Sequence, residues 1–322
     1  MAFDDTSLTS LYYKNFINEL NKYEFDSITC HYVKDALFIR NYLKNNNSAA
    51  KLILMSHSPE PPSEEIYTSE KANKNPYAEQ NYLKWKNIEK EAFCASADIL
   101  LFPSEESIEP YYNALPYFKE LLGIKKFLFL ETGCCPLKTK NSYDSLRNKY
   151  NIKTKFVISY IGRHNKIKGY DLLQKIAAVI LEKRNDVTFL IGGKISNEIL
   201  PLNNERWIEL GFINPADVIT VSDCFILPNR QTYFDLVLLE VLSMGCPIFA
   251  TKTGGNKAVF KRTRAIMLYE NIDECVDKIN KYLDFSIDKK DKFKKQIIDA
   301  YNKYYTIEVF AKNYEDMISK IK

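Results

Sequence analysis

The sequence has no run of about eighteen or more apolar residues, so it predicts no helix that could cross a bilayer. Its first residues, from Met1 to Asp5, lack the basic and then apolar pattern of a secretory signal, and we expect a cytoplasmic protein. The seven cysteines are odd in number and do not show the paired spacing of a zinc site. A reducing compartment keeps such cysteines as thiols, so we predict neither a disulfide framework nor a zinc centre.

The sequence also lacks a strong charge excess. Its formal net charge of +4 is too small, and too evenly spread, to indicate nucleic acid as a partner. Two basic stretches, residues 138–155 and 289–295, have two open interpretations. They are either a surface that rests on the anionic inner face of a membrane or a solvated face rich in lysine.

What is present suits a large globular protein, because 46% of the 322 residues are hydrophobic and two domains are expected. Helical and strand patterns alternate through most of the chain, which favours parallel sheets covered by helices. The first half predicts helices at residues 33–43 and 82–94 and short buried strands at residues 25–30, 51–56, 98–102 and 126–131. Residues 58–78 hold four prolines and predict a long loop, either a functional lid or disordered.

The second half is more regular. It predicts helices at residues 170–184 and 236–244, the second ended by Gly245 in a left-handed cap, and strands at residues 156–161, 187–191, 224–227 and 247–250. We therefore predict an α/β protein of two Rossmann-like, doubly wound domains.

The predicted domains are residues 1–149 plus 306–322 and residues 150–305, with a polar linker at 138–155. The last segment starts at Thr306, a residue suited to an N-cap, and has apolar residues at helical spacing up to Ile321. We expect this helix to cross back onto the first domain.

Glycine is scarce, and its placement is informative. All but two of the ten glycines fall between Gly162 and Gly255. Glycine is needed where the backbone approaches a ligand closely or takes a positive φ. We therefore expect a nucleotide pocket in the second domain.

Two basic residues stand where a strand ends and a helix begins, in Gly162-Arg163 and Lys168-Gly169. Ligands of open α/β sheets bind in the crevice at the carboxyl ends of the strands. There an arginine and a lysine can neutralise a diphosphate through charge-assisted hydrogen bonds. Basic residues are also common in ordinary surface loops, so the pair alone is a weak signal.

A longer motif follows at residues 227–245, where a buried strand leads into a loop and a short helix. The N-terminal amides of such a helix form an anion site. Glu240 lies in the middle of the helix within an apolar run, and an ionised carboxylate there is costly unless a group donates hydrogen bonds to it. Sugar hydroxyls would do so, although a solvent-facing glutamate or one paired with a lysine remains open.

The order and spacing of these residues resemble the donor-binding half of the GT-B-fold retaining glycosyltransferases of group 1, or family 4-like, bacterial polysaccharide type. The residues that carry the resemblance are Gly162-Arg163, Lys168-Gly169, Pro228, Phe234, Leu236, Glu240, Gly245, Pro247 and Gly254-Gly255. The resemblance covers residues 156–260. It implies that Arg163 and Lys168 contact the donor diphosphate and that Glu240 binds the ribose hydroxyls. It also implies that the backbone from Phe234 to Leu236 faces the donor sugar and phosphates.

Three positions depart from that family pattern. Thr232 stands where the first of two glutamates, normally in contact with the transferred sugar, is expected. Asp235 replaces a common glycine, and Asn256-Lys257 replace Pro-Glu. Either a subfamily has its own sugar contacts, or the change at Thr232 reflects a lost active site. Both Thr232 and Asp235 are kept among the predicted donor-binding residues.

The first half resembles the acceptor domain of the same group. His31 matches a histidine that lies beside the transferred sugar in several members, which implies a catalytic place for it; an ordinary structural histidine is the alternative. His57 is a second candidate at the end of the next strand. No glycine precedes Gly123, so the glycine-rich first strand and helix of the acceptor domain has no counterpart, through truncation or through loss in this subfamily.

The resemblance implies a hexosyltransferase that moves a hexose from a nucleoside diphosphate sugar to a glycan or lipid-linked acceptor, with retention. The sequence has no Asp-x-Asp, the triplet with which the other main glycosyltransferase fold holds a metal, so we predict no metal and no cofactor. Arg163, Lys168 and His31 are the predicted catalytic residues. The alternatives are a non-catalytic, glycosyltransferase-like partner subunit and an epimerase or phosphorylase of the same fold.

Overall fold

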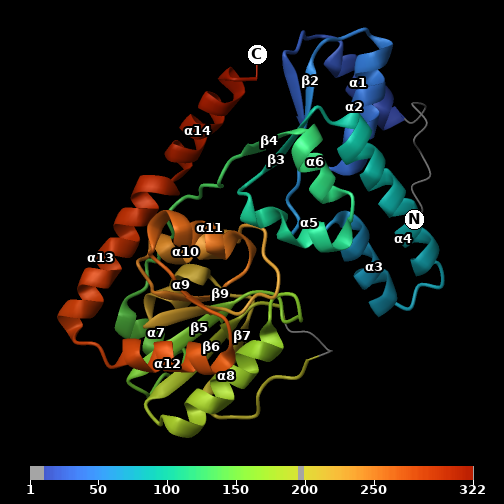
Figure 1. Cartoon of the computed structure of the whole chain (residues 1–322). Coiled ribbons are helices and arrows are strands. Elements are labelled where there is room, and N and C mark those ends of the chain that lie inside the picture. The colour runs from blue at the N-terminus through green and yellow to red at the C-terminus, as the bar shows by residue number, and fades with distance from the viewer. Residues whose placement is uncertain (1–10, 195–198, 322) are drawn as a thin grey trace. The chain divides into compact units, whose positions relative to one another are not determined.

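A computed structural model describes residues 11–194 and 199–321 of the chain, so Met1 to Asp5 lie outside the described residues. The chain divides into two compact units, shown in Figure 1. Unit 1 consists of residues 1–102, 110–130 and 314–322, and unit 2 of residues 103–109 and 131–313. Each is an α/β unit with one parallel sheet, as the alternation of patterns predicts.

The sheet of unit 1 has four parallel strands in the order β1-β2-β3-β4. Its strands are β1 (Ser27–Cys30), β2 (Lys51–Met55), β3 (Ile99–Phe102) and β4 (Lys126–Phe129), each close to a predicted strand. Its helices are α1 (Leu11–Leu20), α2 (Val33–Asn45), α3 (Pro62–Ala72), α4 (Ala78–Lys90) with a π-helical turn η1 (Glu91–Ser96), α5 (Glu109–Ala114) and α6 (Phe118–Ile124). No strand precedes β1 among the described residues.

The prediction of a long loop over residues 58–78 is wrong, because α3 fills most of that segment. Pro61 and Pro62 stand at the start of the helix, where proline costs no hydrogen bond, and Glu64 and Glu65 lie in its first turn. The buried carboxylate of Glu89 on α4 accepts hydrogen bonds from the Ser63 amide at 2.6 Å and the Ser63 hydroxyl at 2.7 Å. A contact with α4 therefore secures the first turn of α3.

The sheet of unit 2 has six parallel strands in the order β10-β9-β8-β5-β6-β7. Its strands are β5 (Phe156–Ile161), β6 (Val187–Gly192), β7 (Trp207–Gly211), β8 (Cys224–Leu227), β9 (Ile248–Thr251) and β10 (Met267–Tyr269). Its helical elements are η2 (Glu106–Ile108), α7 (Tyr143–Lys149), α8 (Tyr170–Lys183), α9 (Pro215–Thr220), α10 (Leu236–Ser243), α11 (Gly254–Thr263), α12 (Ile272–Leu283), α13 (Ile287–Tyr304) and α14 (Ile307–Ser319), the last of which continues into unit 1 at Tyr314.

Both faces of this sheet are covered. Phe156, Ile158 and Tyr160 on β5 pack into a core with α8 and α12, and Val157 between them packs into a second core with α7 and α9. Figure 1 shows α8 and α12 together along one side of the sheet. Alternate side chains of β5 therefore pack against helices on opposite faces of the sheet, which is the doubly wound arrangement.

The polar segment 138–155 is part of unit 2 rather than a free linker. It contains α7, and Leu146, Tyr150 and Ile152 are buried in the second core. Thr139 donates a hydrogen bond to Asp217 on α9 at 2.6 Å. The composition of this segment is polar because only a few of its side chains face the sheet.

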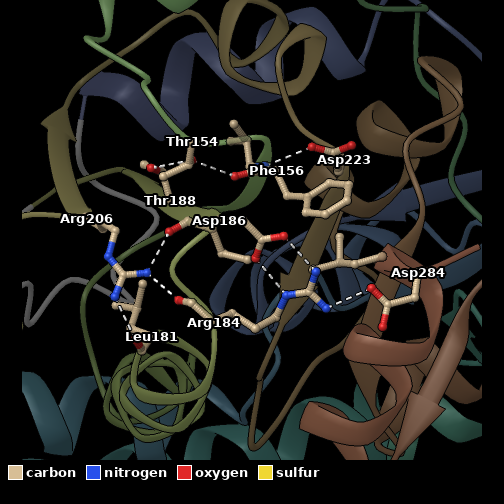
Figure 2. Close-up of polar contacts among 12 residues, drawn as sticks. Thr154, Phe156, Leu181, Arg184, Asp186, Thr188, Arg206, Asp223 and Asp284 are labelled. Carbon is tan, nitrogen blue, oxygen red and sulfur yellow. Dashed lines mark hydrogen bonds and ion pairs between the residues drawn. The ribbon is translucent and has the colours of Figure 1, made fainter.

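A network of polar contacts joins the loops at the amino ends of β5 and β6 (Figure 2). Arg184 makes two hydrogen bonds to Asp186, both at 2.9 Å, and a third to Asp284 at 2.9 Å. Arg206 donates to the carbonyl groups of Leu181, Arg184 and Val187. These arginines are fully engaged in holding the fold together.

Candidate functional site

The order of strands in unit 2 reverses between β5 and β8, which are neighbours although β6 and β7 lie between them in the sequence. Chain connections leave such a point in opposite directions, and a crevice opens at the carboxyl ends of the two strands. The loop that follows β5 carries Arg163 and Lys168, and the loop that follows β8 leads into α10. The predicted donor-binding residues of unit 2 therefore follow the two strands at this switch point.

Arg163 is exposed in the loop after β5, and the hydroxyl of buried Tyr160 donates to its backbone carbonyl at 2.9 Å. Within the part of the chain that the structure describes, its guanidinium makes no ion pair. By contrast, Arg184 and Arg206, at the amino ends of β6 and β7, each donate hydrogen bonds to several carboxylate or carbonyl oxygens. Arg163 is thus a cation that is free to meet an anionic ligand.

Lys168 is held by an ion pair. Its ammonium lies 2.6 Å from Oδ1 of Asp235, and the two side chains are only 17% and 14% exposed. The amide of Asn229 donates to the other oxygen of Asp235. Asp235 therefore joins the loop after β5 to the loop after β8, a role that the sequence pattern did not predict.

Gly169 permits these two loops to approach each other. Its φ is +69°, and a Cβ atom at this position would lie 1.8 Å from the carbonyl oxygen of Pro228. Nearby, Arg230 makes a bidentate pair with Asp171, at 2.6 and 2.7 Å, and its amide donates to the Ile167 carbonyl at 2.8 Å. The glycine predicted beside a ligand is required first for packing between the loops.

The helix α10 begins after Asp235 and presents Glu240 on its second turn. Glu240 is half-buried, and no described residue donates a hydrogen bond to its carboxylate. Desolvation by burial raises the pKa of this carboxyl group.

The other predicted residues around the start of α10 differ in exposure. Phe234 is buried, whereas Leu236 is 54% exposed at the start of the helix. No contact among the described residues joins Glu240 to Arg163 or Lys168.

Thr232, at the position of the missing glutamate, is fully buried, with an exposed fraction of 0%. Its carbonyl oxygen would lie 1.9 Å from a Cβ atom at Gly254, whose φ is +39°, so this glycine is required by the close approach of the two backbones. The amide of Gly254 donates to Glu109, the last residue of the first segment of unit 2, at 3.1 Å. The N-terminus of α11 is therefore already occupied by a carboxylate.

Several buried oxygens around this loop lack a hydrogen-bond partner among the described residues. They are Oδ1 of Asn229, Oε1 of Gln231, Oγ1 of Thr232 and Oδ1 of Asn256. Buried polar atoms of this kind are normally satisfied by protein, water or ligand. The sequence signal for them is the polar run of residues 229–232 directly after a buried strand.

His164, next to Arg163, is a buried residue that the sequence analysis missed. Its ring stacks on Tyr170 with the centroids 4.1 Å apart, and its Nε2 lies 3.8 Å from Glu209. Burial lowers the pKa of the imidazole, so the side chain is neutral near pH 7. It supports the loop that carries Arg163 without adding charge to the site.

The two histidine candidates are in unit 1. His31 directly follows β1 and His57 lies two residues after β2, and their rings stack with the centroids 4.7 Å apart. Nδ1 of His31 and Nε2 of His57 form a close contact. Burial is the main cause that lowers the pKa of His57, and the charge of His31 acts in the same direction. The structure thus pairs two residues that the sequence treated as separate candidates.

Residues 155–284 match the family described as Glycosyl transferases group 1. The spore coat protein SA of Bacillus subtilis is 25% identical over 163 residues, which are 44% of this chain and 43% of that protein. The D-inositol 3-phosphate glycosyltransferase of Corynebacterium urealyticum is 28% identical over 134 residues, which are 36% of this chain and 32% of that protein. The chain thus matches less than half the length of either relative.

Among solved structures, Anabaena HepE in complex with UDP and glucose is similar with a TM-score of 0.69 and 14% identity. The likeness covers 98% of this chain and 84% of that chain, and it shows the fold. No helix among the described residues is long and apolar enough to span a membrane. Residues 155–284, less than half of the chain, are therefore similar to the group 1 glycosyltransferases, and the chain has the GT-B fold.

Proposed function

We propose that the protein transfers a hexose from a nucleoside diphosphate sugar to a hydroxyl of a glycan or lipid-linked acceptor, with retention and without a metal. The observation that carries this proposal is the half-buried, unpartnered carboxylate of Glu240 on the helix that starts at the switch point between β5 and β8. Two ribose hydroxyls would donate the hydrogen bonds that this carboxylate lacks. The family of residues 155–284, and the UDP and glucose in the HepE complex, support this class of donor.

In the reaction, the bond between the anomeric carbon and the diphosphate oxygen breaks, and its electron pair leaves with the diphosphate. The oxygen of the acceptor hydroxyl forms the new bond to the anomeric carbon, and its proton passes to the leaving diphosphate. Arg163 and Lys168 would stabilise the charge that develops on the leaving group. The backbone from Phe234 to Leu236 would face the donor phosphates and sugar, beside Thr232 and Gly162, and His31 would lie near the transferred hexose.

A first experiment measures thermal unfolding with UDP, GDP, UDP-glucose and other nucleotide sugars. A ligand at about 100 times its dissociation constant stabilises a protein by about 2.7 kcal/mol, so the accepted base should be evident as a raised Tm. A chain that no nucleotide stabilises would contradict the proposal and favour the non-catalytic partner subunit. The buried Thr232 in place of a sugar-contacting glutamate is the observation that keeps that candidate open.

A second experiment measures turnover with the donor found in the first. Arg163→Ala and Lys168→Ala should each lower kcat about a hundredfold or more, since each removes a charge from the developing diphosphate. Lys166→Ala, an exposed lysine in the same loop, is the matched control and should leave kcat unchanged. Analysis of the product with labelled donor separates transfer from epimerisation and shows whether the configuration is retained.

A further inference from the structure

Unit 2 has a concave region at the far edge of its sheet, at β10, two strands away from β8. A cavity of about 380 Å³ lies among α11, β10, α12 and α13. Seven of its ten lining residues are aromatic or aliphatic: Phe260, Ile266, Met267, Leu268, Tyr282, Phe285 and Phe293. Its volume is within the usual range of ligand pockets, about 300–1,000 Å³.

The walls of the cavity are held in place by contacts among aromatic rings. Tyr282 is buried, and its ring centroid lies 5.7 Å from that of Phe285 and 6.3 Å from that of Phe293. The segment that follows α12 therefore forms one wall and the second turn of α13 another. The hydrogen-bonding groups of the lining belong to Arg264, Lys278, Lys281 and Tyr282, and the other lining side chains are apolar, so the cavity suits a hydrocarbon chain better than a sugar.

Cations surround this apolar space. Arg264 and Lys281 line the cavity, and both are exposed. Arg264 lies over the ring of Phe260 at 4.2 Å, and Lys289 lies over the ring of Phe285 at 3.4 Å. None of the three has a carboxylate partner among residues 11–194 and 199–321.

Two acidic side chains of α12 and its end are already engaged. Glu274 pairs with Lys278 at 2.7 Å, and Asp284 pairs with Arg184 at 2.9 Å. The first pair neutralises Lys278, which also lines the cavity, and neither carboxylate pairs with Arg264, Lys281 or Lys289. Ile287, 77% exposed at the start of α13, adds an apolar side chain to the same region.

We propose that this cavity binds the hydrocarbon chain of an anionic membrane lipid, with the lipid phosphate at Arg264, Lys281 and Lys289. A buried methylene group contributes about 0.8 kcal/mol, and a lysine or arginine near an anionic surface contributes about 1 kcal/mol. The lysine-rich stretch 289–295 then has a function on the membrane rather than in water. The proposal is independent of the proposed transferase activity, since it concerns a different edge of the sheet.

The charge requirement is tested by co-sedimentation with vesicles of phosphatidylcholine alone and of phosphatidylcholine with about 30% phosphatidylglycerol. The full chain should bind the anionic vesicles, and Lys281→Glu with Lys289→Glu should weaken binding at least about tenfold. Lys44→Glu with Lys51→Glu changes the net charge equally on exposed positions of unit 1 and should leave binding unchanged. No binding of the full chain, or equal losses in the two double variants, would overturn the proposal.

The cavity itself is tested by fluorescence quenching with lipids brominated in the acyl chain. Phe285→Trp places a reporter in the cavity wall, and Ile287→Trp places one on the exposed surface beside it. We expect the Phe285→Trp signal to be quenched above the background of Trp85 and Trp207. Quenching of Ile287→Trp alone would mean surface adsorption and would refute chain binding in the cavity. If Phe285→Trp does not fold, as judged by its Tm, Phe293→Trp reports on the same space.

Discussion

Glu240 is a single residue whose burial costs stability in the free protein. Its carboxylate is half-buried on α10 with no hydrogen-bond donor among the described residues, and desolvation raises its pKa. A raised pKa means that the folded state binds a proton up to a higher pH than the unfolded state does. The stability linked to this group is therefore full below the unfolded pKa and is lost as the pH rises through the folded pKa.

The variant Glu240→Gln should remove this pH dependence. We expect the free energy of unfolding of the wild type, relative to that of the variant, to fall as the pH rises from about 4 toward neutrality. Urea denaturation of both proteins at several pH values measures it. A difference between them that stays constant with pH would mean that the carboxylate has a partner in solution.

The same variant should behave in the opposite way toward the proposed ligand. Hydrogen bonds to a charged group contribute about 1.5–3 kcal/mol, so Glu240→Gln should weaken binding of the accepted nucleotide by roughly ten- to a hundredfold. Calorimetric titration provides the dissociation constants. Glu182→Gln, which changes an exposed glutamate on α8, is the control that should bind as the wild type does. Equal affinities in all three proteins would remove Glu240 from the site.

Gly169 tests whether the loops of the site depend on close backbone approach. Gly169→Ala brings a Cβ atom to 1.8 Å from the Pro228 carbonyl, whereas Gly211, with a similar φ of +65°, has open space around it. Gly211→Ala should cost only the strain of the left-handed conformation, about 1–2 kcal/mol. Gly169→Ala should cost at least about 2 kcal/mol more, measured by urea denaturation. Equal losses would show that the loops separate easily.

For single residues, the sequence predicts which side chains are candidates for the site better than it predicts which side chains they contact. Lys168 and Glu240 could be singled out because each is a charged residue in an informative local pattern. The pair between Lys168 and Asp235 joins residues 67 positions apart, and no local pattern encodes it. The same holds for the stacking of His164 on Tyr170 and for the contact between His31 and His57.

Among the elements, the helical hairpin of α3 and α4 shows where composition misleads. Four prolines within residues 58–78 suggested a loop, yet two of them lie at the helix start, where proline is tolerated. The contact that secures the helix is made by Glu89, which is buried 26 positions further along. Regular strands such as β5 and β8 were predictable because their apolar runs are short and bounded by polar segments.

Removal of the Glu89 carboxylate should destabilise this hairpin. Glu89→Ala leaves the amide and hydroxyl of Ser63 without acceptors, and unsatisfied buried groups cost about 1–3 kcal/mol each. We expect a loss of about 2–4 kcal/mol in the free energy of unfolding, measured with urea. Glu91→Ala, at an exposed position two residues further on, should change it by less than about 0.5 kcal/mol. Equal small effects would show that α3 is held by other contacts.

For the whole molecule, the feature with most consequence is the reversal of strand order in unit 2. The sequence predicted β5, β6, β8 and β9 of that unit but neither β7 nor β10, and it did not predict the order, because the order depends on which side of β5 each later strand joins. Once the strand order is known, the switch point can be located between β5 and β8. The loops that follow these two strands are distant in the sequence but lie at the same edge of the sheet. The proposed donor site therefore depends on a property that arises only when the whole sheet is assembled.

This dependence leads to a prediction for the chain in solution. If UDP binds at the switch point, hydrogen exchange should slow in residues 162–169 and 229–241, because a ligand suppresses local opening where it binds. Exchange in β1 and β2 of unit 1 should stay within error of the free protein, since those strands are not part of the donor site. Mass spectrometry of peptides from the full chain, with and without saturating UDP, resolves these segments. Protection confined to β10, α12 and α13 would instead place the nucleotide at the apolar cavity, and it would contradict both the proposed donor site and the proposed lipid site.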